Sequence, residues 1–534
     1  MKKILWLLVL TVQFTSAQKI SRADKKIIKS LKKNISFLAD DKLEGRRTGT
    51  AGEKLAYEYI SSLFEKNGLS PKGDGNTYLQ EFEVVEGKQI NATTSMSING
   101  NTLTLEKDFF PFVFSANGTA ETGTYKYWDL KVLLEENKNN PHFDLKDAIK
   151  TEIEKTSGVA AFIIYNTSSI PDELKFEPKG KSFSAKIPVV YISKEAKEKY
   201  LTPVDAAVPI KIIVDITDKK RTGHNVVGYV DNGAAYTIIL GAHFDHLGYG
   251  EDHNSLYAGA TPQIHNGADD NASGTAALIE LGKLLKNSSY KKNNYLFIAF
   301  SGEELGLYGS KYFTEHPTVD INKVTYMINM DMVGRLNDST HGLTIGGYGT
   351  SPAWGEVIKE KNDLFKIKFD SSGTGPSDHT SFYRKDIPVL FFFTGVHSDY
   401  HKPTDDVDKI NYSGELSIVK YIYTIIGSLN EKDKLVFTKT KESATSSKSS
   451  FKVSLGVMPD YTFSEGGVRI DGVSDGKLAQ KIGLKAGDIL LQLGDHSFTD
   501  VQSYMQVLGK FNKGDATKLK VKRGNEILEF AIVF

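Results

Sequence analysis

The sequence predicts an α/β fold with a mixed, mostly parallel central sheet flanked by helices, together with a β-rich inserted domain and a small C-terminal domain. Between residues 220 and 430, nearly continuous apolar runs alternate with loops and helical stretches. Such runs are typical of parallel strands, which helices cover on both faces. The strand candidates are 236–240, 295–300, 324–329 and 387–393, and residues 272–285 are predicted to form a helix.

The first part of the chain predicts elements that extend the same domain. Residues 25–39 and 52–67 carry apolar side chains at helical spacing, with a loop at 43–50 between them. Residues 78–115 alternate between apolar and polar side chains, as half-buried strands do. We therefore expect residues 18–115 to be the N-terminal part of the α/β domain.

Changes in the composition and hydrophobic pattern of the sequence predict three further units. Residues 116–219 contain short β runs and charged helical stretches, which indicates a β-rich module inserted into the α/β domain. The α/β pattern then resumes as the main part of that domain at 220–430. A polar stretch at 431–450 predicts a linker, and residues 451–534 have the length of a compact domain.

Composition limits the kinds of site and partner to be expected. At 534 residues the chain is too long for a single core. Lys+Arg and Asp+Glu balance at 66 each, so the charge indicates neither nucleic acid nor an anionic membrane as a partner. The absence of cysteine excludes disulfides, thiol catalysis and thiolate metal sites. Any metal would be held by His, Asp and Glu, which suits zinc.

Residues 1–17 have the parts of a signal peptide. Lys2 and Lys3 form a basic start, residues 4–12 are apolar, and small residues ending at Ala17 offer a cleavage site. The apolar run is too short to span a bilayer as a helix. Because no later run reaches that length, we expect an exported bacterial protein, periplasmic or secreted, without an integral membrane segment.

Two adjacent acidic residues, Glu303 and Glu304, follow the strand candidate 295–300. Neighbouring side chains at a strand end point in different directions. One carboxylate can therefore hold a metal while the other handles a proton, as metal-assisted hydrolysis requires. Taken alone, the pair proves little, because most Glu-Glu pairs belong to the solvated surface.

Four more residues of metal-ligand type occur beside the predicted strands. They are His243 after the first strand, Asp270 before the helix, Asp331 after the third strand and His401 after the fourth. Ligands in open α/β sheets bind outside the carboxyl ends of the strands. Each residue also has a structural explanation: His243 can be a satisfied core histidine, and Asp270 can cap the helix. Their shared placement favours one metal site.

Five motifs in this order resemble a known family. They are GAHFDH (241–246), GADDNASG (267–274), SGEELGLYGS (301–310), NMDMVG (329–334) and DYHK (399–402). The ordered set is similar to the co-catalytic di-zinc exopeptidases, which include bacterial leucyl aminopeptidases and glutamate carboxypeptidase. The resemblance covers 25–115 and 220–430 in pattern. It implies the zinc exopeptidase fold and two Zn²⁺ ions per chain.

The resemblance assigns a role to each ligand-type residue. His243 and Asp331 would bind one zinc ion. Glu304 and His401 would bind the other, and Asp270 would bridge the two ions.

Three further residues would serve the reaction. A metal-bridging hydroxide would attack the scissile carbonyl, and Glu303 would act as general acid/base. Tyr400 would steady the oxyanion, and Asp245 would orient His243. The implied activity is that of an exported zinc aminopeptidase, which removes N-terminal residues from peptides with a free N-terminus.

The flanking units carry resemblances of their own. Residues 116–219 resemble a protease-associated domain in texture and position, although a purely structural insert explains them equally well. Residues 451–534 are similar to a bacterial PDZ domain, in which a loop at 454–456 would hold a peptide or protein C-terminus. The alternative is a PDZ fold that serves only internal docking.

Several alternatives stay open at this point. A carboxypeptidase or dipeptidase can be built on the same fold. A glutaminyl cyclase resembles the fold but uses one zinc ion, which disagrees with the complete ligand set. A catalytically inactive peptide-binding scaffold would be expected to have lost ligands or the base, and none is missing. The motif Ser377-Asp378-His379 can line the pocket or form a turn, and Arg335 can bind a substrate carboxylate or form an ion pair.

Overall fold

The computed structural model describes residues 21–534 with short interruptions. Left undescribed are 1–20, 141–142, 179–182, 203–207, 253, 258, 260, 360–361, 441–452, 460–465, 474–476 and 500. The predicted signal peptide, 1–17, and the second half of the predicted linker, 441–450, lie outside the described residues. In the parts of the chain that are described, no helix combines the length and apolar character needed to cross a membrane.

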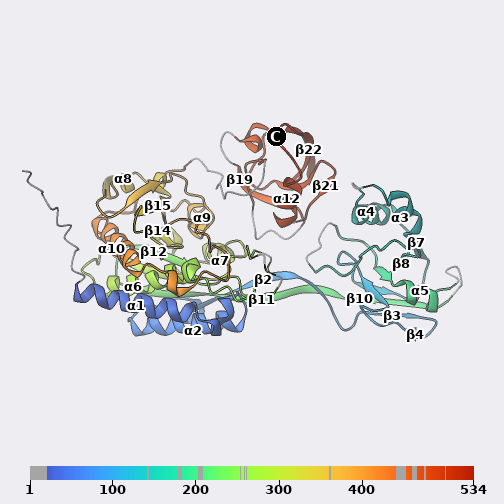
Figure 1. The fold of residues 1–534 in the computed structure, drawn as a ribbon, viewed down its shortest axis with the longest axis horizontal. Helices are drawn as coiled ribbons and strands as arrows, with labels where there is room; N and C mark the ends of the chain where they lie inside the picture. Colours follow the sequence, from blue (N-terminus) through green and yellow to red (C-terminus); the bar gives the residue numbers. More distant parts are fainter. Residues whose placement is uncertain are drawn as a thin grey trace, which may run out of the picture.

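A mixed sheet forms the centre of the largest domain (Figure 1). Its strands are β1 (Ser70–Pro71), β2 (Leu79–Ile90), β11 (Ile216–Val230), β12 (Tyr236–His243), β13 (Asn293–Phe300), β14 (Val324–Met330), β15 (Gly342–Gly346), β16 (Lys366–Phe369) and β17 (Val389–Phe393). Over the described residues their order is β1-β11-β13-β12-β14-β17-β15-β16, with β2 paired to β11. The inner strands β13, β12, β14 and β17 are parallel, whereas β11 runs antiparallel to β13, and β15 runs antiparallel to β17 but parallel to β16. The predicted mixed sheet is confirmed.

Helices cover both faces of this sheet, as predicted. The helices α1 (Arg22–Leu38), α2 (Ala51–Lys66), α6 (Gly274–Lys286) and α10 (Tyr412–Ser428) share one core with it, and α7 (Tyr308–Glu315) and α9 (His379–Tyr383) share the other. Side chains of a strand alternate between its two faces. On β13, Phe297 accordingly joins the first core and Ile298 joins the second.

The chain between the first two helices folds closely against a distant segment. Side-chain oxygens of Ser21 and Thr50 accept backbone N–H groups and so cap α1 and α2. The connecting segment η1 (Asp41–Arg46) is a short 3-10 turn. Gly45 has a φ of 70°, and a Cβ there would lie 2.6 Å from the His265 carbonyl oxygen. Only glycine permits this approach, which brings the turn against the chain that precedes α6.

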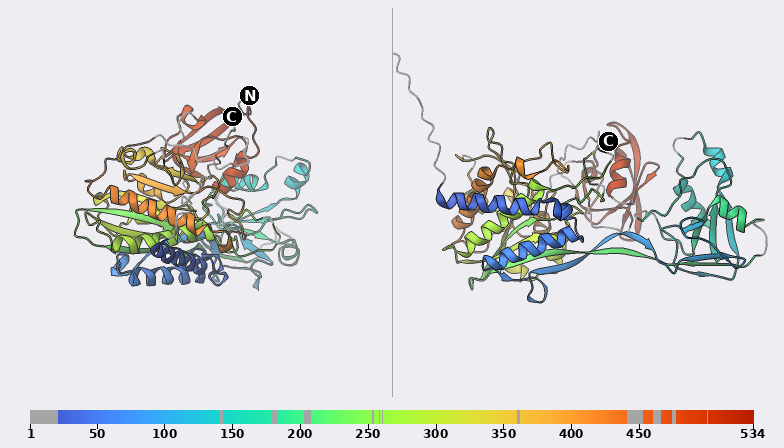
Figure 2. Two further views of the ribbon diagram at one scale, coloured as in Figure 1. Left: turned by 60° about the vertical axis from the view of Figure 1, so that its left-hand side comes forward. Right: turned by 60° about the horizontal axis from the view of Figure 1, so that its bottom comes forward.

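A long antiparallel ribbon of β2 and β11 joins the main sheet to a β-rich module (Figures 1 and 2). The module contains the strands β3 (Ser95–Ile98), β4 (Asn101–Thr102), β5 (Phe109–Pro111), β6 (Gly118–Ala120), β7 (Tyr125–Asp129), β8 (Ala161–Tyr165), β9 (Val189–Ile192) and β10 (Ile210–Val214). Two sheets form, in the orders β4-β3-β10-β6 and β5-β9-β8-β7. The first strand of these two sheets, β3, begins at Ser95, which lies before residue 116, where the sequence analysis begins the inserted module. Helices α3 (Lys131–Asn137), α4 (Leu145–Lys155) and α5 (Lys194–Tyr200) complete the module, whose likeness to a protease-associated domain stays a prediction.

The C-terminal unit is a separate antiparallel sheet with its own core. Its strands are β18 (Val457–Pro459), β19 (Val468–Val473), β20 (Ile489–Leu493), β21 (His496–Ser497), β22 (Ala516–Arg523) and β23 (Glu526–Val533). The helices α11 (Leu478–Lys481) and α12 (Val501–Leu508) accompany them. Leu455, Ile470 and Leu490 are fully buried in this core.

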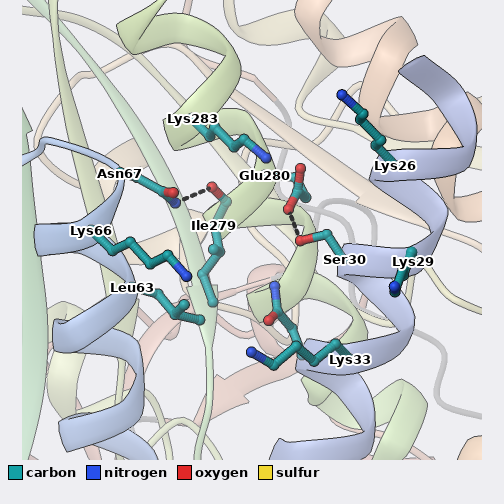
Figure 3. A pocket seen from close by; sticks show the side chains of 11 residues that line it. Lys26, Lys29, Ser30, Lys33, Leu63, Lys66, Asn67, Ile279, Glu280 and Lys283 are labelled. Atoms are coloured by element: carbon teal, nitrogen blue, oxygen red, sulfur yellow. Dashed lines mark hydrogen bonds between the residues drawn. The ribbon is translucent and has the colours of Figure 1, made fainter. Parts of the chain in front are cut away.

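A pocket with a volume of about 350 Å³ opens between α1, α2 and α6 (Figure 3). Five lysines line it: Lys26, Lys29, Lys33, Lys66 and Lys283. At its centre Ser30 donates a hydrogen bond to the buried Glu280, which ties α1 to α6. None of the predicted ligands lines this pocket, so it is distinct from the metal site considered next.

Candidate metal centre

The predicted site residues converge at the carboxyl ends of the parallel strands. His243 ends β12, Glu303 and Glu304 follow β13, Asp331 follows β14, His401 follows β17, and Asp270 lies in η3 (Ala268–Ser273), the turn before α6. The sheet geometry explains the convergence, because parallel neighbours present their carboxyl ends at one edge.

The first group consists of His243, Asp270 and Asp331. The Nε2 atom of His243 lies 3.4 Å from Asp270 Oδ1 and 3.4 Å from Asp331 Oδ1. Their ligand atoms all lie within 4.8 Å of one another, and all three residues are buried. Donor atoms this close can surround a single cation.

The second group lies across Asp270 from the first. His401 Nε2 is 3.4 Å from Asp270 Oδ2 and 3.2 Å from Glu304 Oε2. The two oxygens of Asp270 therefore face two different histidines. This arrangement suits a carboxylate shared by two metal ions.

A third histidine, His246, contacts the second group, and the sequence analysis did not anticipate it. Its Nδ1 lies 2.6 Å from Glu304 Oε1, and ligand-type atoms of His246, Asp270 and Glu304 lie within 4.8 Å of one another. The available signal was its place in GAHFDH, three residues after His243. That spacing does not reveal which carboxylate the ring meets.

Glu303 lies beside the first group. Its Oε2 is 3.9 Å from His243 Nε2, and its backbone N–H donates to the Asp245 carboxylate at 3.2 Å. Burial raises the pKa of Glu303 well above its usual value; the His243 charge opposes this rise, and the Glu304 charge adds to it. A carboxyl group with a raised pKa is suited to exchanging protons near neutral pH.

The charged groups of the site balance one another. Burial lowers the pKa of His243, but the Glu303 and Asp331 carboxylates outweigh it and hold that pKa well above its usual value. Burial likewise opposes ionisation of Asp270, yet hydrogen bonds from His243 and His401 keep its pKa well below its usual value. Protons on the histidines thus hold the carboxylates together, and a divalent cation would take their place.

Asp245 and Ser377 each contact a predicted ligand, but they do so through different groups. His243 Nδ1 lies 3.2 Å from the Asp245 carbonyl oxygen and 3.7 Å from the Asp245 carboxylate. Asp245 thus supports His243 chiefly through its backbone. Ser377 Oγ donates to Asp331 Oδ2 at 2.8 Å. The Ser377 motif therefore contacts one of the predicted ligands and helps to orient it.

Two side chains fix the turn that carries Asp270. Asp405 accepts the backbone N–H groups of Asp269 and Asp270, each at 3.0 Å. The side-chain amide of Asn271 donates to the Met330 carbonyl oxygen at 2.9 Å, which ties the turn to the end of β14. Asp405 was missed because nothing in its local sequence distinguishes a buried carboxylate from a loop residue.

The structure also places Tyr400 and Arg335. The Tyr400 ring stacks on His401 with centroids 3.9 Å apart. Burial, with added effect from the Asp270 charge, raises the pKa of Tyr400 well above its usual value, so its hydroxyl can donate a hydrogen bond. Arg335 lies 3.3 Å from Asp399, which is the ion-pair alternative of the sequence analysis.

The donor set fits zinc or a similar divalent ion. Imidazole nitrogens and carboxylate oxygens are zinc ligands, and the chain has no competing thiolate. His401 Nδ1 lies 2.9 Å from the Asn254 carbonyl oxygen, which directs the other ring nitrogen toward the carboxylates. The fold and the site together define a class: an α/β protein with a two-part cluster of histidines and carboxylates that could hold metal ions.

Comparison with known proteins specifies the class further. Residues 225–426 match peptidase family M28, and residues 444–533 match the PDZ domain. The chain carries a peptidase family M28 domain and a PDZ domain. The predicted kinship with metallo-exopeptidases and the predicted PDZ domain are thereby confirmed.

Individual relatives agree with this assignment. The aminopeptidase YwaD of Bacillus subtilis is 27% identical over 285 residues, which are 50% of this chain and 56% of the relative. An aminopeptidase of Pseudomonas aeruginosa is 24% identical over 420 residues, 69% of this chain and 70% of the relative. The chain thus aligns with little more than half of YwaD. Among solved structures, BSAP, a zinc aminopeptidase from Bacillus subtilis, is 21% identical with a TM-score of 0.44, covering 77% of this chain and 98% of that one.

Proposed function

We propose that the chain is a zinc-dependent aminopeptidase that removes N-terminal residues from peptides. One observation carries the proposal: Asp270 lies between two histidine–carboxylate groups, with Nε2 of His243 and of His401 each 3.4 Å from one of its oxygens. The match to peptidase family M28 and relatives named aminopeptidases support it.

The residues would hold two zinc ions. His243 and Asp331 would bind one, Glu304 and His401 the other, and Asp270 would bridge them. Zinc bound there would lower the pKa of a water molecule and polarise the scissile carbonyl.

Glu303 would carry the proton of the reaction. It would accept a proton from the attacking water and deliver it to the departing amine. Its raised pKa favours the protonated form, which is the form that delivers a proton to the amine. The Tyr400 hydroxyl would donate to the developing oxyanion, while Asp245 and Ser377 would hold His243 and Asp331 in place.

The names of the relatives favour a free amine over a carboxylate as the group that the site recognises. The relatives in Bacillus subtilis and Pseudomonas aeruginosa are both named aminopeptidases. We therefore favour an aminopeptidase over the carboxypeptidase alternative.

The test measures the hydrolysis of a panel of substrates before and after the metal is removed and restored. Purified protein should cleave aminoacyl p-nitroanilides, lose that activity on chelation, and regain it when zinc is added. N-acetylated versions of the same substrates should be inert. Cleavage of N-blocked peptides from the C-terminus would select the carboxypeptidase, and no hydrolysis despite bound zinc would select the inactive scaffold. Metal analysis of the dialysed protein should give two zinc ions per chain.

The C-terminal domain would bind a peptide or protein C-terminus. The loop 454–456 precedes the edge strand β18, which pairs with β19 among the described residues. Gly456 has a φ of 80°, a backbone conformation that glycine adopts more readily than other residues, so the loop contains the glycine that a carboxylate-binding loop would need. Binding of a peptide with a free C-terminus, lost when that C-terminus is amidated, tests the proposal.

Export would place the enzyme in the periplasm or outside the cell. The basic and apolar parts of residues 1–17 support it. Cell fractionation of the producing bacterium, with N-terminal sequencing of the mature protein, should find cleavage after Ala17. Full-length protein retained in the cytoplasm would contradict export.

A further inference from the structure

We propose that Arg46 is a positioning residue of the metal centre: it anchors the two loops that carry His243 and Asp270 and thereby sets the affinity for metal. The inference rests on the proposed function, because it treats those two residues as ligands. Arg46 lies in the loop predicted at 43–50, far from both in sequence.

Within the described part of the chain, the Arg46 guanidinium donates only to backbone carbonyl groups. Nε donates to Phe244 at 2.6 Å, Nη1 to Asn266 at 2.6 Å, and Nη2 to Gly267 at 3.1 Å. A second Nη1 bond goes to Leu38, at the end of α1. Four of the five N–H groups of the side chain are thus used within one plane.

The acceptors are neighbours of the ligands. Phe244 directly follows His243, and Gly267 precedes Asp270 by three residues. Because the guanidinium is planar and rigid, one side chain sets the spacing between the two loops. Arg46 therefore acts on the ligands through the backbone, without touching the reacting atoms.

The surroundings of Arg46 hold it in place. Its side chain is 0% exposed, and its φ of 49° is uncommon for a residue with a Cβ. Such a conformation persists where surrounding structure determines it. The backbone N–H of His246 donates to the Arg46 carbonyl at 3.4 Å, and that of Gly248 to the Gly45 carbonyl at 3.3 Å. The turn and the loop after β12 are thus joined by backbone and side chain together.

The competing explanation is that Arg46 supports metal affinity through its positive charge alone and not through its hydrogen bonds. Burial lowers the pKa of Arg46 to about 10, and the Asp245 and Asp270 carboxylates oppose that fall, so the side chain is charged at neutral pH. A buried cation near acidic ligands stabilises them whatever its hydrogen bonds. Lysine keeps the charge but cannot span several carbonyl groups in one plane, so Arg46→Lys separates the two explanations.

The experiment compares Arg46→Lys and Arg46→Met with Arg47→Lys. Arg47 is the adjacent arginine, and its ion pairs go to the side chains of Glu86, Glu251 and Asp252 instead of the carbonyl groups beside His243 and Asp270. Zinc dissociation constants are measured on the full chain by competition with a chromophoric chelator. Both Arg46 variants should bind zinc at least about tenfold more weakly, as loss of support behind a ligand does, and Arg47→Lys should stay close to wild type. Wild-type affinity in Arg46→Lys would overturn positioning in favour of charge.

Hydrogen exchange of the wild-type protein tests the same anchor if the variants do not fold. Zinc should slow exchange in residues 43–47 as well as in 243–247 and 265–271, although 43–47 contains no ligand, because coupling between sites is reciprocal. Unchanged exchange in 43–47 would overturn the proposal. If the wild type bound no zinc, the proposed function would fail separately. Joint opening of the three segments in metal-free protein would still support the anchor, and independent opening would refute it.

Discussion

Replacing Glu303 by glutamine removes the general acid/base while keeping its shape. The side chain is 11% exposed and lies 3.9 Å from His243 Nε2, so an isosteric amide fits the same space. Glutamine cannot exchange a proton. If Glu303 shuttles the proton, only the chemical step is impaired.

The expected loss of activity follows from the role of Glu303 as general acid/base. A positioned acid/base contributes about 10²- to 10⁴-fold to rate, which corresponds to about 3–5 kcal/mol of activation free energy. We expect the variant to retain its metal. The Glu303 carboxylate raises the pKa of His243, so its removal lowers that pKa and favours the neutral imidazole that binds metal.

The assay measures kcat for a leucine p-nitroanilide at saturating zinc, together with zinc content and circular dichroism. We expect kcat to fall within the stated range while zinc content and fold are unchanged. Turnover within about threefold of wild type would refute the role of Glu303, because the range begins at about 10². If zinc were lost together with activity, we would instead infer that Glu303 is a metal ligand. Glu303→Ala should keep the fold and much of the metal while activity collapses.

Other consequences can be measured separately. Asp270→Ala should remove the shared carboxylate, so both activity and zinc content measured after dialysis should fall; retention of two ions would contradict bridging. Arg47 and Arg221 together outweigh burial and hold the pKa of Asp252 at about 2 instead of 3.8, so their contacts with Asp252 contribute about 2 kcal/mol at neutral pH. That contribution is present above pH 3.8 and is lost as pH falls through about 2. The free energies of unfolding of wild type and Asp252→Asn should accordingly differ at pH 7 and converge at acid pH. Leu240→Ala, at a fully buried position, should cost about 2–5 kcal/mol in urea unfolding, whereas Leu55→Ala, 43% exposed, should cost much less.

The parallel strands could be predicted because their signal is local. Residues 295–300 were expected as a strand, and β13 spans Asn293–Phe300. The strand predicted at 236–240 continues in the structure through His243. Apolar character weakens after Leu240, but pairing with both neighbouring strands extends β12 to the ligand itself.

The irregular start of α6 could not be predicted in the same way. Residues 272–285 were expected to be helical, whereas the α-helix spans Gly274–Lys286 and η3 precedes it as a wider turn. Asp405 and Asn271 hold that turn through contacts with distant segments. Helical periodicity carries no information about such contacts, so the sequence places Asp270 near a helix start without giving its backbone.

The predicted ligands and the residues that support them therefore differ in how far the sequence alone reveals them. His243 and Asp331 stand at strand ends, where residue type and position together indicate chemistry. Arg46 and Asp405 stand in loops, and each acts on backbone groups of segments remote in sequence. A metal centre rich in carboxylates repels itself until cations or protons bind, so its loops need restraint from outside the centre. Arg46 donates to carbonyl groups just before the Asp270 turn, and Asp405 accepts N–H groups within it. Both would therefore supply that restraint to the proposed site, although neither is a ligand.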